Sequence, residues 1–456
     1  MTQMVEIPLW LFVTIVLFAA VTALSHFLLP SVRWFFRRRL QKAVARLNTR
    51  LTRPIEPFKL TRRYDMIQRL SYDPEVTREI VNYARLNDVP ENVAFQKAQS
   101  YAREIVPSFS AFAYFSFGTR LARLLANAVY TVRTGPQNDA VLQEIDSQAT
   151  VIFVMNHRSN MDYVLVTYLA ARTSALSYAV GEWARVWPLS RLIKSMGAYF
   201  IRRKSRGALY RKVLARYVHM ATQGGVAQAI FPEGGLSLNG KQMPPKLGLL
   251  NYVVEGHTDD ERDVVFVPVA INYDRVLEDK VLMAADARGD RRFGARISVV
   301  VGFILRKLWQ TLRGRYSRFG VAAVVFGAPL SLKEFGNDCA VEDLARTLMQ
   351  RVNDAMPVLF VPLVSHVILE HGQPVTDSTL QDLVLDVATK IPPSALLIPA
   401  EAIPAAIRQA CDKMTARGMI IADHGTWSMA DDQKGALAYY ANSIRHLISD
   451  DAATAK

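Results

Sequence analysis

The chain has 456 residues, half of them hydrophobic, and 55 Lys and Arg residues against 41 Asp and Glu give it a net charge of +14. This composition excludes a largely disordered chain and indicates an anionic partner, such as a membrane face, a phosphate-bearing substrate or a nucleic acid. The two cysteines, Cys339 and Cys411, lie far apart and outside any metal-binding motif, so neither a disulfide framework nor a structural zinc site is expected.

Residues 7–29 form an apolar run without a charged side chain. A helix of that length spans roughly 34 Å, enough to cross the hydrocarbon core of a bilayer, which is ~30 Å thick. We therefore expect a transmembrane helix, with a cleaved signal peptide as the alternative. Eight basic residues and no acidic one follow at residues 30–55, which predicts that the rest of the chain lies on the cytoplasmic side.

The basic segment also carries leucine and valine side chains at helical spacing. This pattern predicts an amphipathic helix on anionic headgroups; a solvated basic helix and a nucleic-acid-binding arm are the alternatives. Residues 58–130 are predicted to be helical. A cluster of aromatic side chains within them indicates either core packing or a surface that contacts a membrane or an acyl chain: Phe109, Phe112, Tyr114, Phe115 and Phe117.

Short apolar runs rich in β-branched residues then follow, at residues 151–155, 177–180, 198–201, 226–231, 264–271 and 321–326. Helix-length segments such as residues 208–223 separate most of them. Strands that alternate with helices predict an α/β domain with a largely parallel sheet. After Pro329 the chain is predicted to be mostly helical, with helices at residues 341–356, 377–389 and 404–417.

These elements predict four parts. They are a transmembrane helix (1–30), a basic, amphipathic and helical N-terminal region (31–130), the α/β domain (131–330) and a mostly helical C-terminal region (331–456).

A histidine and an aspartate follow the first strand of the α/β domain. His157 comes directly after the strand at residues 151–155, and Asp162 falls in the first turn of the next helix, which Ser159 or Asn160 can cap. Polar groups at the carboxyl ends of parallel strands are where α/β sheets place their sites. A carboxylate five residues after the histidine can hold one ring nitrogen and leave the other as a base.

Three further segments support a site at this edge. Residues 197–204 (GAYFIRRK) place Arg202 and Arg203 at a strand end, where they could hold a phosphate. Residues 229–235 (AIFPEGG) end a strand with Gly234 and Gly235, whose amides could approach an anion or a developing oxyanion. Residues 267–274 (VPVAINYD) form a buried strand that ends in polar residues.

In this order and at these separations, the four segments resemble the H-x4-D, G-x-x-F-I-R-R, F-P-E-G and V-P-V blocks of the glycerolipid acyltransferases. The residues within these blocks are most similar to those of the glycerol-3-phosphate acyltransferases, and the resemblance extends over roughly residues 60–390. It implies an α/β acyltransferase domain flanked by helical regions. It also implies direct acyl transfer to a glycerol phosphate, with His157 as general base and Asp162 orienting its ring.

The predicted substrate-binding residues are Arg158, Ser159, Arg202, Arg203, Glu233, Gly234, Gly235 and Lys241. Arg202 and Arg203 would pair with phosphate, Glu233 with an acceptor hydroxyl, and the two glycine amides with the oxyanion. One departure concerns the third block, where the family usually has E-G-G-R-S-R and this chain has Leu236 and Leu238 in place of both arginines. Lys241 or Lys246 could supply the missing charge. No metal and no cofactor is expected, with acyl-CoA or acyl carrier protein as the acyl donor.

Two other motifs are incomplete. The hydrolase elbow G-x-S-x-G lacks its last glycine at Asn239, and a P-loop starting at Gly235 has Gln242 in place of the Ser or Thr that would hold magnesium. The predicted partners are membrane lipids, glycerol 3-phosphate and an acyl thioester, with acyl carrier protein as a further partner if it is the acyl donor, and no nucleic acid. Acylation of lysophosphatidate or dihydroxyacetone phosphate, and a catalytically silent lipid-binding protein, are the alternative functions.

Overall fold

The structure is a computed structural model that describes residues 8–18, 38–39, 42–49, 51–170, 174–181, 189–202, 207–255, 257–258, 260–289, 319–336 and 340–448. The chain divides into two units, Met1–Ile55 and Glu56–Lys456, and each is described by itself.

In the first unit, residues 9–18 and 42–48 are helical, and the apolar side chains of residues 9–18 are exposed. Of the transmembrane helix predicted at residues 7–29, residues 7 and 19–29 lie outside the described residues. Within the part of the chain that the structure describes, no helix is both long enough and apolar enough to cross a bilayer. The transmembrane helix therefore stays a prediction.

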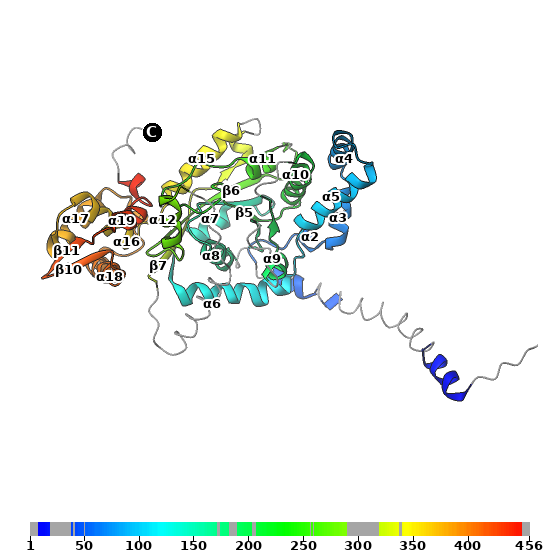
Figure 1. The fold of residues 1–456 in the computed structure, drawn as a ribbon, viewed down its shortest axis with the longest axis horizontal. Helices are drawn as coiled ribbons and strands as arrows, with labels where there is room; N and C mark the ends of the chain where they lie inside the picture. The colour runs from blue at the N-terminus through cyan, green and yellow to red at the C-terminus, as the bar shows by residue number, and fades with distance from the viewer. Residues whose placement is uncertain are drawn as a thin grey trace, which may run out of the picture. The chain divides into compact units, whose positions relative to one another are not determined.

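The second unit is built around an eight-stranded, mostly parallel sheet (Figure 1). The strands are β1 (Thr131–Thr134), β2 (Thr150–Met155), β3 (Ser177–Val180), β4 (Tyr199–Phe200), β5 (Gln228–Ile230), β6 (Val264–Tyr273), β7 (Val321–Phe326) and β8 (Leu330–Ser331). Their order is β1-β7-β6-β2-β5-β3-β4, and β8 pairs with β6. Only the pairings of β6 with β7 and with β8 are antiparallel. The predicted α/β domain with a largely parallel sheet is confirmed.

The central strands β2 and β6 are buried along their whole length. Successive side chains of a strand point to opposite faces, so in β2 Val151 and Phe153 pack into one apolar cluster, whereas Ile152 and Val154 pack into a second. A sheet covered on both faces needs continuous apolar strands, which is why these segments read as unbroken β-branched runs in the sequence.

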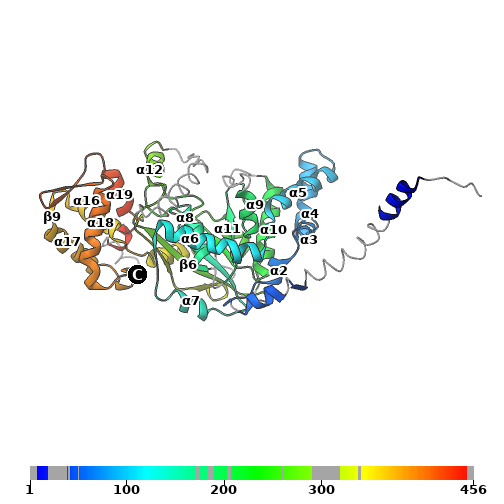
Figure 2. The ribbon, with the colours of Figure 1, turned by 90° about the horizontal axis from the view of Figure 1, so that it is seen from below.

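Helices cover both faces of the sheet. α6 (Thr119–Val129) and α8 (Met161–Ala170) lie on one face, and α10 (Ala208–Gln223), α11 (Gly248–Val254) and α15 (Val341–Asp354) lie on the other (Figures 1 and 2). Shorter helices are α7 (Asn138–Glu144), α9 (Leu189–Ser195), α12 (Asp279–Ala287) and α14 (Leu332–Phe335).

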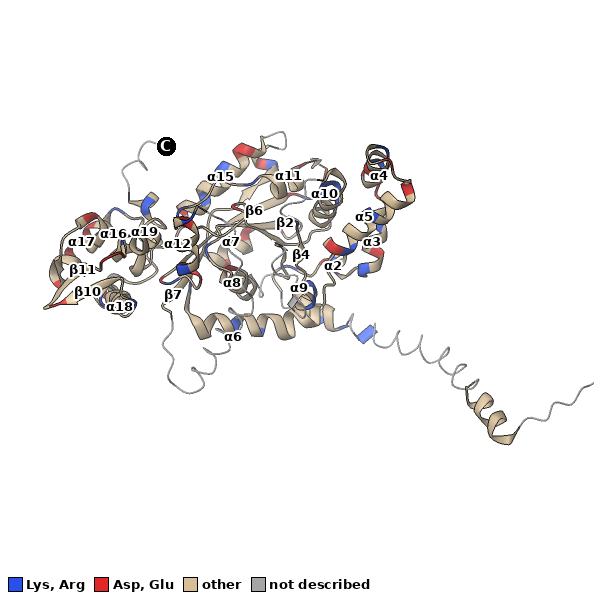
Figure 3. Ribbon diagram, in the orientation of Figure 1, with Lys and Arg blue, Asp and Glu red and all other residues tan. Residues whose placement is uncertain are grey.

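A layer of N-terminal helices packs against α10. It consists of α3 (Arg63–Ser71), α4 (Pro74–Leu86) and α5 (Glu91–Ile105), and the short α2 (Pro57–Leu60) precedes it in the chain. Asp73 caps α4 by accepting hydrogen bonds from the amides of Glu75 and Val76, with Pro74 at the first helical position. The same carboxylate pairs with Arg216 of α10 at 3.0 Å, so the cap also fastens this layer to the sheet domain. Figure 3 shows acidic and basic residues interspersed on these helices.

The aromatic cluster divides between the core and the surface. It lies around the π-helix η1 (Ala113–Gly118), which leads into α6. Tyr114 is fully buried, and its hydroxyl accepts a hydrogen bond from the amide of Leu176. Phe112 and Phe117 are exposed, at 72% and 52%. Tyr114 therefore fits the predicted role in core packing, whereas Phe112 and Phe117 are accessible for the predicted surface contact.

The C-terminal region is mostly helical, as predicted, but it also holds a small antiparallel sheet that was not predicted. The helices are α16 (Phe360–His371), α17 (Asp377–Thr389), α18 (Ile403–Thr415) and α19 (Lys434–Ala441), with short 3-10 turns η3 (Pro393–Ala395), η4 (Ala400–Ala402) and η5 (Arg445–Leu447). The sheet has the order β10 (Ile420–Asp423), β11 (Thr426–Met429), β9 (Val375–Thr376). His424 and Gly425 both have positive φ angles, as a two-residue hairpin turn requires.

Candidate active site

His157 and Asp162 are joined by a turn between the end of β2 and the start of α8. Asp162 Oδ2 lies 2.9 Å from His157 Nδ1 and accepts hydrogen bonds from the amides of Arg158, at 2.8 Å, and Ser159, at 3.0 Å. His157 is 3% exposed and Asp162 is fully buried. One carboxylate oxygen thus fixes both the ring and the backbone that carries it. Because a carboxylate accepts hydrogen bonds, the proton of the neutral imidazole is held on Nδ1.

The remainder of the imidazole is packed against aromatic rings. The ring centroid of Phe231 lies 4.2 Å from that of His157, and the Tyr163 ring stands edge-on at 5.4 Å. No described residue forms a hydrogen bond with Nε2 of His157. The nitrogen that carries no proton is therefore the one left to accept a proton from a bound group.

The second oxygen of Asp162 accepts a 2.5 Å hydrogen bond from the hydroxyl of Tyr273, at the end of β6. Burial, followed by the charge of Asp162, raises the pKa of this phenol well above its ordinary value, so Tyr273 stays a donor. Because β6 runs parallel to β2, the residues at their carboxyl ends meet at one edge of the sheet. Tyr273 belongs to the strand predicted at residues 267–274, but no local pattern in the sequence marks it for a role.

Glu233 ties the loop after β5 to the loop after β2. Its Oε1 accepts the amide of His157 and its Oε2 accepts the amide of Met243, both at 2.9 Å. The side chain is 1% exposed, and burial raises the pKa of its carboxyl group to about 7 against the pull of these hydrogen bonds and of Arg158. Both oxygens thus already hold a backbone donor. The predicted contact of Glu233 with an acceptor hydroxyl stays a prediction.

Only one of the two glycine amides in this loop is available. Gly234 has φ +63°, and its amide donates to the carbonyl of Phe231 at 2.9 Å. This amide would have to leave its turn to serve an oxyanion, whereas no acceptor for the amide of Gly235 is found among the described residues. A Cβ on Gly234 would stand 2.7 Å from Cδ of Lys246, so the Lys246 side chain passes over this glycine.

Leu236 and Leu238 turn inward. Each is 8% exposed and packs into the apolar cluster of the α8 face, which includes Met161 and Leu165. The glycerol-3-phosphate acyltransferases that the sequence resembles usually have arginines at these two positions, whereas this chain has leucines that pack into the hydrophobic core. A phosphate-binding charge must come from elsewhere.

Of the two predicted arginines of the second block, the structure describes Arg202, which is engaged by an acidic residue of α5. Arg202 makes a two-point ion pair with Glu104 of α5, with Nε–Oε1 at 2.9 Å and Nη2–Oε2 at 2.6 Å. Its guanidinium also stacks over the rings of Tyr101 and Tyr210. Arg203 lies outside the described residues. The ion pair ties the end of β4 to α5, and binding of phosphate by either arginine stays a prediction.

Ser159 is engaged by a residue far away in the sequence. Its hydroxyl donates to Oε2 of Glu278 at 2.7 Å, and the Asn160 side chain donates to Oε1 at 3.0 Å. Burial raises the pKa of Glu278. No local signal marked Glu278, because its partners lie 118 and 119 residues earlier in the chain. Among the described residues, no group of three or more His, Cys, Asp or Glu side chains could hold a metal ion.

Comparison with known proteins finds two families. The family described as "Acyltransferase" matches residues 137–272, which hold the His157–Asp162 turn and the loop of Glu233. The family described as "Glycerol-3-phosphate acyltransferase C-terminal region" matches residues 305–456.

The curated relatives that match are described as glycerol-3-phosphate acyltransferases. A glycerol-3-phosphate acyltransferase of Alteromonas mediterranea is 27% identical over 405 residues, which is 82% of this chain and 48% of that protein. One of Pseudomonas syringae pv. tomato is 30% identical over 280 residues, 60% of this chain and 32% of that protein. The chain thus spans about half the length, or less, of these relatives. A solved 1-acyl-sn-glycerophosphate (LPA) acyltransferase, PlsC, from Thermotoga maritima is 16% identical with a TM-score of 0.33, covering 61% of this chain and 91% of that one.

Proposed function

Because the chain belongs to the glycerol-3-phosphate acyltransferase family, with the acyltransferase domain and the C-terminal region of that family, we propose that it acylates glycerol 3-phosphate. The fatty acyl group passes from an acyl thioester to the sn-1 hydroxyl, the first acylation step of phospholipid synthesis. The observation that carries the proposal is the buried His157–Asp162 pair, 2.9 Å apart, with Nε2 of His157 unengaged by any described residue.

In the proposed mechanism, Nε2 of His157 takes the proton of the acceptor hydroxyl while the hydroxyl oxygen attacks the thioester carbonyl carbon. The tetrahedral intermediate collapses, the carbon–sulfur bond breaks, and the imidazolium returns its proton to the departing sulfur. Asp162 stabilises the imidazolium and holds its ring, a role of the kind played by the aspartate of a Ser-His-Asp triad. General-base help of this sort contributes ~10²–10⁴ in rate.

In this proposal the amide of Gly235 stabilises the oxyanion of that intermediate. It has no acceptor among the described residues, whereas the amide of Gly234 already donates to Phe231. A donor directed at developing charge in a water-poor site is a large contributor to acyl-transfer catalysis. Acyl-CoA and acyl carrier protein are both suitable donors for this chemistry.

The proposal is tested by supplying membranes that contain the protein with labelled glycerol 3-phosphate and an acyl thioester, beside His157→Ala. We expect labelled lysophosphatidate from the wild type and none from the variant. Lysophosphatidate and dihydroxyacetone phosphate run in parallel as acceptors, because the buried Leu236 and Leu238 depart from the usual arginines of the family. Activity with one of these alone would reassign the acceptor, and silence with all three would favour a lipid-binding role.

Membrane attachment through residues 7–29, with the α/β domain on the cytoplasmic side, is part of the proposal. The uncharged run and the eight basic residues after it support this arrangement. The exposed Phe112 and Phe117, in a stretch without acidic residues from 109 to 130, add a second apolar contact surface. Release from membranes by high salt alone, without detergent, would contradict it.

A further inference from the structure

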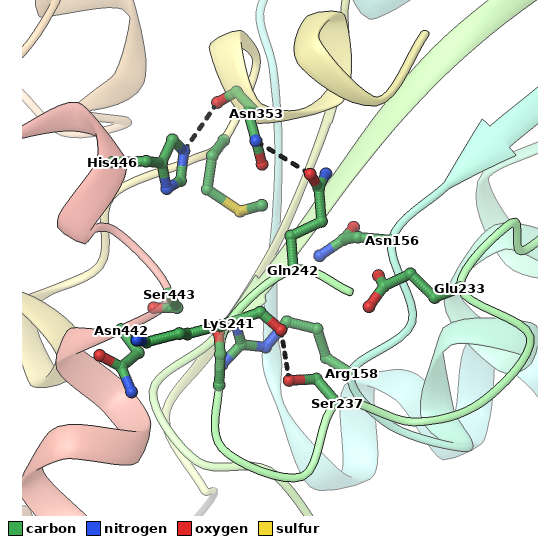
Figure 4. A pocket seen from close by; sticks show the side chains of 12 residues that line it. Asn156, Arg158, Glu233, Ser237, Lys241, Gln242, Asn353, Asn442, Ser443 and His446 are labelled. Carbon is green, nitrogen blue, oxygen red and sulfur yellow. Dashed lines mark hydrogen bonds between the residues drawn. The ribbon is translucent and has the colours of Figure 1, made fainter. Parts of the chain in front are cut away.

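A small pocket lies beside the loop of Glu233, on the side where the C-terminal region meets the sheet domain (Figure 4). The lining comes from three parts of the chain: Asn156 and Arg158 after β2; Glu233, Ser237, Gly240, Lys241 and Gln242 after β5; and Asn353, Met356, Asn442, Ser443 and His446 from α15 onward.

Arg158 is the central feature of this pocket. Its side chain is only 3% exposed, and Nη1 donates to the carbonyl of Gly240 at 2.9 Å, while the guanidinium lies over the ring of Tyr439. Nε and Nη2 are buried and have no hydrogen-bond partner among the described residues. These two N–H groups form one edge of the planar guanidinium, the edge that binds two oxygens of one anion. Buried charged donors without acceptors are unfavourable, so the edge is suited to an anionic ligand.

The other lining groups add positive charge and hydrogen-bond donors. Figure 4 shows the side chain of Lys241 running toward Asn442 and Ser443 at one end of the pocket, with His446 and Asn353 at the other. Glu233 is the acidic member of the lining, and both of its oxygens accept backbone amides. With Arg158 and Lys241 opposing one carboxylate, the pocket favours an anion.

We propose that this pocket binds a phosphate group of a substrate through the Nε–Nη2 edge of Arg158, with Lys241 and the C-terminal Asn442, Ser443 and His446 around it. The inference rests on the proposed function, which supplies two sources of phosphate, the acceptor glycerol 3-phosphate and the CoA of the donor. It assigns the C-terminal region a direct part in the substrate site. It also accounts for the leucines at positions 236 and 238, because the charge is delivered from Arg158 instead.

The test uses the full chain purified in detergent. Arg158→Lys keeps the charge but loses the two-point edge, Lys241→Met removes the exposed amine, and His446→Gln changes the C-terminal wall. Lys390→Met, which removes a surface lysine paired with Asp386, is the matched control for Lys241→Met. For each protein, the KM for glycerol 3-phosphate, the KM for acyl-CoA, and the shift in melting temperature with inorganic phosphate at constant ionic strength are measured.

We expect Arg158→Lys and Lys241→Met to raise the KM for one phosphate-bearing substrate on the order of tenfold or more, since a charge-assisted hydrogen bond is lost. A rise confined to glycerol 3-phosphate assigns the pocket to the acceptor, and a rise confined to acyl-CoA assigns it to the donor. In both cases the melting shift with inorganic phosphate shrinks in the variants and not in Lys390→Met.

Unchanged KM values for both substrates, together with an unchanged melting shift in folded Lys241→Met and His446→Gln, would overturn the proposal and leave the proposed function standing. The opposite outcome is also possible to distinguish. The wild type would then acylate none of the acceptors but would be stabilised by inorganic phosphate, and this stabilisation would be lost in Arg158→Lys. The phosphate pocket would then be supported and the proposed reaction would not.

Discussion

The hydroxyl of Tyr273 donates a 2.5 Å hydrogen bond to Oδ1 of Asp162, while Oδ2 of the same carboxylate faces Nδ1 of His157 at 2.9 Å. The two partners of Asp162 come from neighbouring parallel strands, β6 and β2. A carboxylate held on both oxygens has one orientation, so the direction in which the imidazole presents Nε2 is set by Tyr273 through Asp162. Tyr273 is in this sense a positioning residue.

Tyr273→Phe removes this hydrogen bond without changing the shape of the core. We expect kcat to fall on the order of tenfold with little change in KM, because Asp162 can then rotate. The free energy of unfolding should fall by about 1.5–3 kcal/mol, the range for a hydrogen bond to a charged group. Steady-state kinetics and urea denaturation measure both quantities. Tyr199→Phe is the control, since that buried hydroxyl has no partner among the described residues, and an equal loss of kcat there would remove the case for Tyr273.

Asp162→Asn replaces an acceptor of four hydrogen bonds with an amide that must also donate. We expect kcat to fall by a factor on the order of 10²–10⁴, because the imidazole loses the partner that fixes its proton on Nδ1. Residues that act as a unit are not additive. The double variant Asp162→Asn/His157→Ala should therefore be no slower than His157→Ala alone, and a further multiplicative loss would mean that Asp162 acts independently of the histidine.

Glu233 predicts a specific pH dependence of stability. Its folded-state pKa of about 7 lies above the ordinary 4.5, because burial disfavours the charged form. The protonated carboxyl group of Glu233 therefore contributes its full stabilisation of the folded state below about pH 4.5. This contribution to the free energy of unfolding is lost as the pH rises toward 7, by up to about 3 kcal/mol. Glu233→Gln cannot ionise, so its free energy of unfolding relative to the wild type should improve over this interval.

Urea denaturation at several pH values measures that difference. The exposed Glu401→Gln serves as the matched control, for which we expect no comparable trend. A constant difference between wild type and Glu233→Gln from pH 4.5 to pH 7 would show that this carboxyl group titrates normally in the folded protein.

Leu238→Arg restores the family's usual residue at a position that faces the core of this chain. Burying a guanidinium among apolar side chains without a partner should lower the free energy of unfolding by roughly 2–5 kcal/mol. We expect no improvement in the KM for glycerol 3-phosphate. Leu238→Met, which conserves volume, should cost less than about 1.5 kcal/mol. A stable arginine variant with a lower KM would show that the loop can turn this position toward the acceptor.

Much of the central fold could be predicted because its signals are local. The strands predicted at residues 177–180 and 321–326 have the same bounds as β3 and β7, since short β-branched runs between turn residues are sufficient to mark a buried strand. The short, partly exposed β1 and the hairpin of β10 and β11 were not predicted. Each has only four residues and no run of buried side chains. The positive φ angles at His424 and Gly425 explain the hairpin only once the structure is known.

The same division holds for the candidate site. The His157–Asp162 turn could be predicted from one short segment, because the five-residue spacing after a strand is closed by nearby backbone amides and by the start of a helix. Only the tertiary structure brought Tyr273 to Asp162, Glu278 to Ser159 and His446 to the pocket of Arg158. Such pairs depend on strand order, register and the packing of helices over the sheet. No residue near Asp162 or Arg158 in the sequence carries that information.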